Sequence, residues 1–176
     1  MAKRYGPKTI GSVASQRVFF DANVLVYLFW PTGLQHWELQ YAKLFSRLLK
    51  QSNQFITDIT VISEVINSML RVEHKKSSPN SPFKPYRDSK VGRAALADIH
   101  TIVKGDILPN FELAAPSLGK ADIEGLLYEN ELDFSDKIIE KLCIDQGLIL
   151  LTNDKDFRKS NVDIISANPA LSNKAK

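Results

Sequence analysis

The stretch RVFFDANVLVYL, residues 17–28, determines how the rest of the chain is organised. Residues 18–20 are a short run of bulky, β-favouring side chains, which is typical of a strand buried on both faces. Asp21 follows at the point where such a strand would end. Asn23 is suited to cap a helix, and apolar residues at helical spacing come after it. We therefore predict a strand, an acid at its exit, and then a helix.

The remaining sequence repeats this alternation of strand and helix. Short apolar runs predict strands at 54–57, 111–114, 148–151 and 162–166. Helical spacing predicts helices at 37–49, 59–69, 91–103, 117–130 and 136–146, and the positions expected to face the core include Ile59, Val91, Ile123 and Leu127. Alternating strands and helices favour a parallel sheet with right-handed crossovers. We expect an α/β fold with a central parallel sheet of about five strands flanked by helices.

The length and composition predict one domain. A chain of 176 residues, of which 44% are hydrophobic, can bury a sizeable core. We assign residues 17–166 to this domain, residues 1–16 to a loose basic arm and residues 167–176 to a polar tail. Residues 74–90 contain three prolines and four serines and predict a loop or flap inserted into the domain.

Charge and motif content restrict the functional classes. The net charge of +3 permits an anionic partner. One cysteine excludes an intramolecular disulfide framework and fits a reducing cytoplasm. No apolar run approaches the roughly 20 residues that a membrane span needs. The sequence has neither a Walker-type glycine loop nor a GxGxxG motif, which disfavours nucleotide hydrolysis by a P-loop.

Four acids are predicted to meet at one edge of the sheet. Asp21 and Asp154 each follow a buried strand, and Asp136 begins the helix that leads into the second of these strands. Glu64 lies in the second turn of the helix that Asp58 caps. Each acid alone has an ordinary structural explanation as a turn, cap or boundary residue. Together they would repel one another unless a hard cation such as Mg²⁺ or Mn²⁺ lay between them.

Four segments resemble the motifs of PIN-domain nucleases in the family's order. They are FDANVLVYL (20–28), ISEV (62–65), DKII (136–139) and LTNDKDF (151–157). Their spacing resembles that of VapC-type toxins of bacterial toxin–antitoxin pairs, and the resemblance covers roughly residues 17–166. It implies a three-layer PIN-like fold and a metal-dependent endoribonuclease. It also implies a homodimer held inactive by a small antitoxin protein that covers the site.

The resemblance also implies roles for individual residues. The residues that would hold Mg²⁺ or Mn²⁺ and orient the attacking water are Asp21, Glu64, Asp136 and Asp154. Asp156 matches the family's trailing acid as a further metal ligand, and Asp133 competes with Asp136 for the third role. Asn23 and Thr152 would support the site through hydrogen bonds. The basic residues expected to contact RNA phosphates are Lys75, Lys76, Lys84, Arg87 and Lys155, although a solvated loop explains residues 74–90 equally well.

Three alternatives stay open. The first is a PIN-fold nuclease that processes RNA without acting as a toxin. The second is a haloacid-dehalogenase-like phosphatase, but that family needs an aspartate two residues after the first, where this chain has Asn23. The third is a non-catalytic RNA-binding or scaffold protein, which the presence of all four acids argues against.

Overall fold

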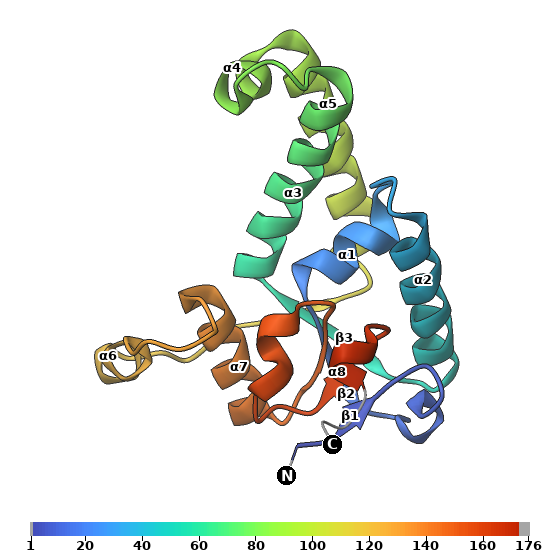
Figure 1. Cartoon of the computed structure of the whole chain (residues 1–176), viewed down its shortest axis with the longest axis vertical. Helices are drawn as coiled ribbons and strands as arrows, with labels where there is room; N and C mark the ends of the chain where they lie inside the picture. Colours follow the sequence, from blue (N-terminus) through green and yellow to red (C-terminus); the bar gives the residue numbers. More distant parts are fainter. Residues whose placement is uncertain (1, 173–176) are drawn as a thin grey trace.

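The computed structural model describes residues 2–172 and contains one six-stranded parallel sheet (Figure 1). Its strands are β1 (Arg4–Tyr5), β2 (Arg17–Phe20), β3 (Gln54–Asp58), β4 (Glu112–Ala114), β5 (Ile149–Leu151) and β6 (Ile164–Ile165). They lie in the order β1-β6-β5-β2-β3-β4, and every neighbouring pair is parallel. The predicted parallel α/β fold is therefore confirmed, with six strands where about five were expected.

Helices flank the sheet, with α7 on one side and α2 on the other in Figure 1. The α-helices are α1 (Ala22–Phe29), α2 (Gln35–Lys50), α3 (Ile59–Ser77), α4 (Phe83–Asp88), α5 (Lys90–Ile102), α6 (Lys120–Leu126), α7 (Phe134–Gln146) and α8 (Pro169–Ser172). The shorter turns are the 3-10 helices η1 (Ile10–Ser12) and η3 (Lys155–Lys159) and the π-helix η2 (Val103–Ile107). Within residues 2–172, none of the helices combines the length and apolarity that a membrane span requires.

Strand β2 is central, as its continuous apolar run predicted. Val18, Phe19 and Phe20 are fully buried, since helices cover both faces of the sheet. Phe20 aligns with Leu151 of β5, and the following N–H of Asp21 donates to the Leu151 carbonyl at 3.1 Å. The carboxyl ends of β2 and β5 therefore meet at the same edge of the sheet.

The first 16 residues are not a loose arm. Arg4 and Tyr5 pair with Ile164 and Ile165 of β6. Ile10 and Val13 are each only 1% exposed. Two buried apolar side chains and a strand pairing tie this segment to the domain, so the prediction from its basic composition was wrong.

Residues 74–90 are largely helical rather than a loop or flap. They hold the end of α3, all of α4 and the first residue of α5, and Figure 1 shows α4 and α5 at the far tip of the molecule. Pro82 precedes α4, and Pro85 lies in its first turn, where the missing N–H costs no helical hydrogen bond. The prolines therefore mark a helix start, which the composition alone did not distinguish from a loop.

Three further expectations need correction. The helix predicted at 117–130 is the shorter α6. Four positions expected to face the core are exposed: Ile59, Val91, Ile123 and Leu127. The predicted polar tail is helical at α8, where Leu171 is buried against the domain. Residues 173–176 of that tail lie outside the described residues.

Candidate metal and active site

Asp21 lies at the exit of β2 and is the N-cap of α1. Its side chain is only 5% exposed. Oδ1 accepts from the Ala22 N–H at 2.7 Å, and Oδ2 accepts from Asn23 Nδ2 at 2.6 Å and from Thr152 Oγ1 at 2.5 Å. Burial raises the pKa of Asp21 to about 6, although the hydrogen bonds from Thr152 and Ala22 act in the opposite direction. The surrounding donors fix the position of this carboxylate.

Asn23 and Thr152 also connect Asp21 to the segment that follows β5. Asn23 Oδ1 accepts from the Asn153 N–H at 3.1 Å. Thr152 Oγ1 accepts from the Asp154 N–H at 2.9 Å while its own proton is donated to Asp21. The two predicted supporting side chains thus hold the exits of β2 and β5 in one fixed arrangement.

Asp136, Asp154 and Asp156 form the most compact group of acids at this edge. One carboxylate oxygen from each lies within 4.8 Å of the others. Burial raises the pKa of Asp136 to about 7, and the nearby charges of Asp133, Asp21 and Asp154 act in the same direction. Three convergent oxygen ligands suit a hard divalent cation, which would relieve this repulsion.

Asp133 and Asp136 have different surroundings at the start of α7. Asp133 is the N-cap, and its Oδ1 accepts from the Asp136 N–H at 2.9 Å and from Ser135 Oγ at 2.8 Å. The hydrogen bond from the Asp136 N–H is the main reason that the pKa of Asp133 is lowered. Asp133 therefore caps the helix, and Asp136 is the acid that joins the compact group.

Glu64 faces the same site from α3 but lies outside the compact group. Burial raises its pKa, and the charges of Asp21, Asp133 and Asp154 raise it further. Glu64 lines two grooves, one on each side of α3. The charges of Asp21 and Asp154 act on both Glu64 and Asp136, so the four acids predicted from the sequence lie near one another. Asp136 and Asp154 belong to the compact group, and Asp21 and Glu64 lie beside it.

The five predicted basic residues do not gather at the site. Lys155 is exposed next to Asp154, and Lys75 lines a groove that also contains Glu64. Lys76 donates to the Pro31 carbonyl and to Glu73. Lys84 and Arg87 belong to α4, which Figure 1 places at the tip of the molecule, away from the carboxyl ends of the strands.

Sequence reasoning missed two buried polar side chains, one of which bonds directly to the segment that carries Asp154. The Tyr41 hydroxyl donates to the Thr152 carbonyl at 3.0 Å, and burial raises its pKa, so the phenol stays protonated. Lys137 is buried, its Nζ donates to the Leu126 and Tyr128 carbonyls, and it lies 4.3 Å from the centre of the Tyr128 ring. Tyr41 occupies a core-facing position of α2, whereas Lys137 lies opposite the apolar face of α7 and is buried by the segment that follows α6. Local sequence patterns gave no signal for either set of hydrogen bonds.

Comparisons with known proteins support this description of the fold. The family model described as PIN domain matches residues 18–162. A search of curated proteins gave no match. A solved structure described as VapBC2 from Rickettsia felis bound to a DNA fragment from their promoter contains a chain of similar fold, with a TM-score of 0.50 and 15% identity over 86% of this chain and 98% of that one. Because the family model spans most of the sequence, this protein belongs to the PIN domain family.

Proposed function

We propose that this protein is a metal-dependent endoribonuclease that hydrolyses RNA phosphodiester bonds. The observation that carries the proposal is the compact group of Asp136, Asp154 and Asp156 beside Asp21 and Glu64 at the carboxyl edge of a parallel sheet. Ligands bind at this edge in open α/β sheets. Membership of the PIN domain family and the mildly basic net charge are consistent with a phosphate-rich substrate.

The residues present fit a divalent cation such as Mg²⁺ or Mn²⁺. Asp136, Asp154 and Asp156 supply converging oxygen atoms, and Asp21 and Glu64 add negative charge around them. A bound cation of this kind lowers the pKa of water and neutralises charge on a phosphodiester. Asn23 and Thr152 fix the position of the Asp21 carboxylate, and Tyr41 holds the backbone that leads to Asp154.

We further propose that the protein is the toxin of a toxin–antitoxin pair. The support is the resemblance of its motifs to VapC-type toxins and the similar fold of a chain in a VapBC2 structure. In this proposal the protein works in the cytoplasm as a homodimer, and a small antitoxin protein covers the acidic site. An RNA-processing nuclease without a toxin role shares the same chemistry, so only a cellular experiment separates the two.

The enzymatic proposal is tested by incubating purified protein with RNA in Mg²⁺, Mn²⁺ or EDTA. We expect cleavage with either cation and none with EDTA. Asp154→Asn removes one predicted ligand and should abolish cleavage, whereas Asp98→Asn changes an exposed acid of α5 and should not. RNA binding without cleavage under every condition would instead indicate a non-catalytic RNA-binding protein.

The toxin proposal is tested by inducing the protein in a bacterial host. We expect growth arrest with the wild type and normal growth with Asp154→Asn at equal expression. If the gene immediately upstream encodes a small DNA-binding protein, its co-expression should restore growth. An active nuclease that leaves growth unaffected would favour the RNA-processing alternative.

A further inference from the structure

One face of α3 runs outward from the acidic site. It is acidic at Glu64 and basic farther along the helix. Glu64, Ser68, Arg71 and Lys75 follow one another at intervals of four, three and four residues. At 3.6 residues per turn these side chains lie in one narrow stripe. The eleven residue steps from Glu64 to Lys75 span about 16.5 Å at 1.5 Å per step. We call these four residues the α3 stripe.

Grooves on both sides of α3 make the stripe accessible. One groove of about 440 Å³ lies against α1 and the 31–34 segment, and its lining includes Asn23, Tyr27, Glu64 and Lys75. The other, of about 610 Å³, includes Glu64, Arg71 and Ser135. Glu64 and Ser68 line both grooves, so the surface is continuous from the acidic site along α3.

The basic end of the stripe is available to an anion. Among the ion pairs of residues 2–172, none involves Arg71 or Lys75. The Arg71 guanidinium lies over the Phe83 ring at 4.3 Å, which orients its planar donors without using them. A ligand that matches this surface therefore carries one negative group at the acidic site and further negative groups near Arg71 and Lys75.

Hydrogen bonds within the protein fix the wall of the 440 Å³ groove that lies against α1. Glu73 accepts from Trp30 Nε1 at 3.0 Å and from Lys76 Nζ at 3.0 Å. Lys76 also donates to the Pro31 carbonyl. These bonds join α3 to the segment after α1. Lys75 and Lys76 both line the groove, but only Lys76 makes these bonds.

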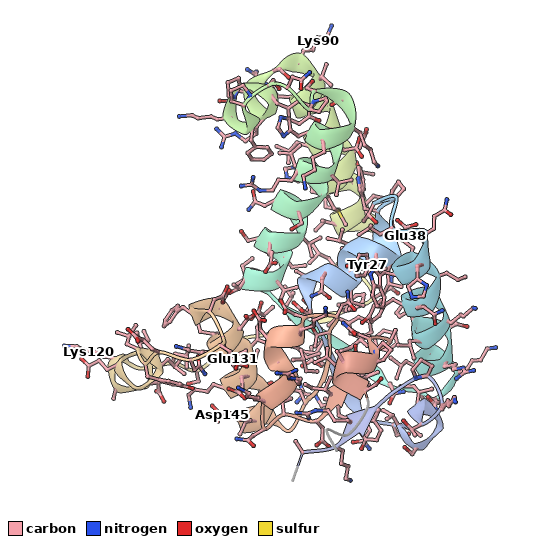
Figure 2. All side chains as sticks on the ribbon, in the orientation of Figure 1. Tyr27, Glu38, Lys90, Lys120, Glu131 and Asp145 are labelled. Carbon is pink, nitrogen blue, oxygen red and sulfur yellow. The ribbon has the colours of Figure 1, made fainter. Side chains whose placement is uncertain are left out.

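Tyr27 gives this groove an aromatic surface. Its ring stacks on Tyr41 with centroids 5.6 Å apart and planes at 22°, and its hydroxyl accepts from Asn153 Nδ2 at 3.3 Å. Figure 2 labels Tyr27 on α1, the helix that forms this wall. Aromatic side chains held in this way stack on unpaired bases, which a duplex does not offer.

We propose that the α3 stripe and its grooves bind single-stranded RNA leading away from the bond that is cut. This inference rests on the proposed nuclease function and adds the path that the strand takes beyond the cut bond. One phosphate lies at the acidic site, the following phosphates contact Arg71 and Lys75, and a base stacks on Tyr27. The acidic stretch near Glu64 and the basic stretch beyond it then serve the same strand.

The test compares two variants that each lose two positive charges. Arg71→Gln/Lys75→Gln removes the basic end of the stripe, and Lys43→Gln/Lys104→Gln removes exposed charges from α2 and η2. Binding of a labelled single-stranded oligoribonucleotide is measured in EDTA, so that the RNA stays intact, and thermal melting checks that both variants fold. We expect the stripe variant to bind about tenfold more weakly, with a salt slope smaller by about 1.4, and the control to bind as the wild type does.

Cleavage of a dinucleotide gives a second readout. A dinucleotide has one phosphate, which the acidic site holds, so its cleavage with Mn²⁺ should be the same in the stripe variant and the wild type. Unchanged binding in the stripe variant, equal losses in both variants, or equal affinity of the wild type for duplex RNA would each overturn the strand path while leaving the nuclease proposal intact. A wild type that cleaves no RNA with any divalent cation would overturn the nuclease proposal and this inference with it.

Discussion

At the scale of single residues, Asp21 combines near-complete burial with hydrogen bonds from three donors. Asp21→Asn keeps the size of the side chain but removes its charge. We expect the fold to survive, because loss of a buried charge offsets the disturbed hydrogen bonds with Asn23 and Thr152. Mn²⁺-dependent RNA cleavage should fall at least about 100-fold, since one carboxylate of the proposed site is lost. Circular dichroism checks that the fold is retained, and a cleavage assay checks that activity is lost. Full activity in this variant would reject the site.

The division of roles between Asp133 and Asp136 gives a second prediction. Asn caps helices about as well as Asp, so Asp133→Asn should retain both stability and cleavage. Asp133→Ala should lower the free energy of unfolding by about 1 kcal/mol through loss of the cap. Asp136→Asn should lose cleavage instead, since Asp136 belongs to the compact group. If Asp133→Asn were the inactive variant, the assignment of the third acid would be reversed.

The raised pKa values of Asp21 and Asp136 predict how stability depends on pH. Each pKa lies above its usual value of 3.8, at about 6 and about 7, so the folded state disfavours the charged forms. Without metal, their contribution to stability is complete below about pH 4 and is lost as the pH rises through 6 and 7. Mn²⁺ should therefore raise the melting temperature at pH 8 and have little effect at pH 5, where protonated carboxyl groups compete with the metal.

Asp136→Asn is the control for this pH dependence. It should flatten the metal-free profile between pH 5 and pH 8 and reduce the gain from Mn²⁺. A metal-free protein that becomes steadily more stable over that range would contradict the proposed origin of the effect.

The sequence predicted which strand exits carry acids, because the carboxyl ends of parallel strands share one edge. It did not separate Asp133 from Asp136, because that distinction depends on the residue at which α7 begins. It also did not predict that Tyr41 supports the site, because its hydroxyl bonds to Thr152, which lies 111 positions away in the chain. Contacts of that kind depend on tertiary packing, which local patterns do not encode.

At the scale of helices and strands, the start of α5 packs directly against the backbone of α4. We call this junction the α4–α5 corner. One residue, Ser89, separates the helices, and its hydroxyl donates to the Tyr86 carbonyl while accepting from the Gly92 N–H. A Cβ at Gly92 would overlap the Tyr86 carbonyl oxygen and lie 2.9 Å from the Arg87 Cα. The neighbouring atoms are backbone, so they cannot move aside cheaply.

Gly92→Ala should therefore lower the free energy of unfolding by about 1–3 kcal/mol, the usual cost of overpacking. Gly105→Ala is the matched control, since a Cβ there meets nothing within 4 Å. It should leave stability unchanged or raise it slightly through the lower entropy of the unfolded chain. Urea unfolding of both variants measures the difference, and equal effects would show that the corner tolerates a side chain.

Element boundaries near this corner were poorly predicted for a physical reason. Proline, serine and lysine are typical of loops, and the same residues also begin and end short helices. The strongly apolar strands β2 and β5 were predicted correctly because they need both faces covered. Amphipathic signals in short helices such as α6 are weak, and Leu127 shows that an apolar residue there need not be buried.

At the scale of the whole molecule, the first residues of the chain form part of the sheet. The Lys3 N–H donates to Asp163 Oδ1 at 2.6 Å, and the Arg4 guanidinium donates to the Ser160 and Val162 carbonyls at 2.6 Å each. A two-residue strand such as β1 is too short for a periodic signal, so the sequence could not predict it. Charged residues that suggested a loose arm are instead bonded to the edge of the sheet.

The burial of Ile10 makes this segment part of the cooperative fold. Ile10 is 1% exposed, and Leu39, an apolar residue on the outer face of α2, is 54% exposed. Ile10→Ala should lower the free energy of unfolding of the entire domain by about 2–4 kcal/mol, because it leaves a cavity in the core. Leu39→Ala should change stability by less than about 0.5 kcal/mol. Denaturant unfolding followed by circular dichroism measures both, and a negligible effect of Ile10→Ala would mean that the first residues fold independently of the sheet.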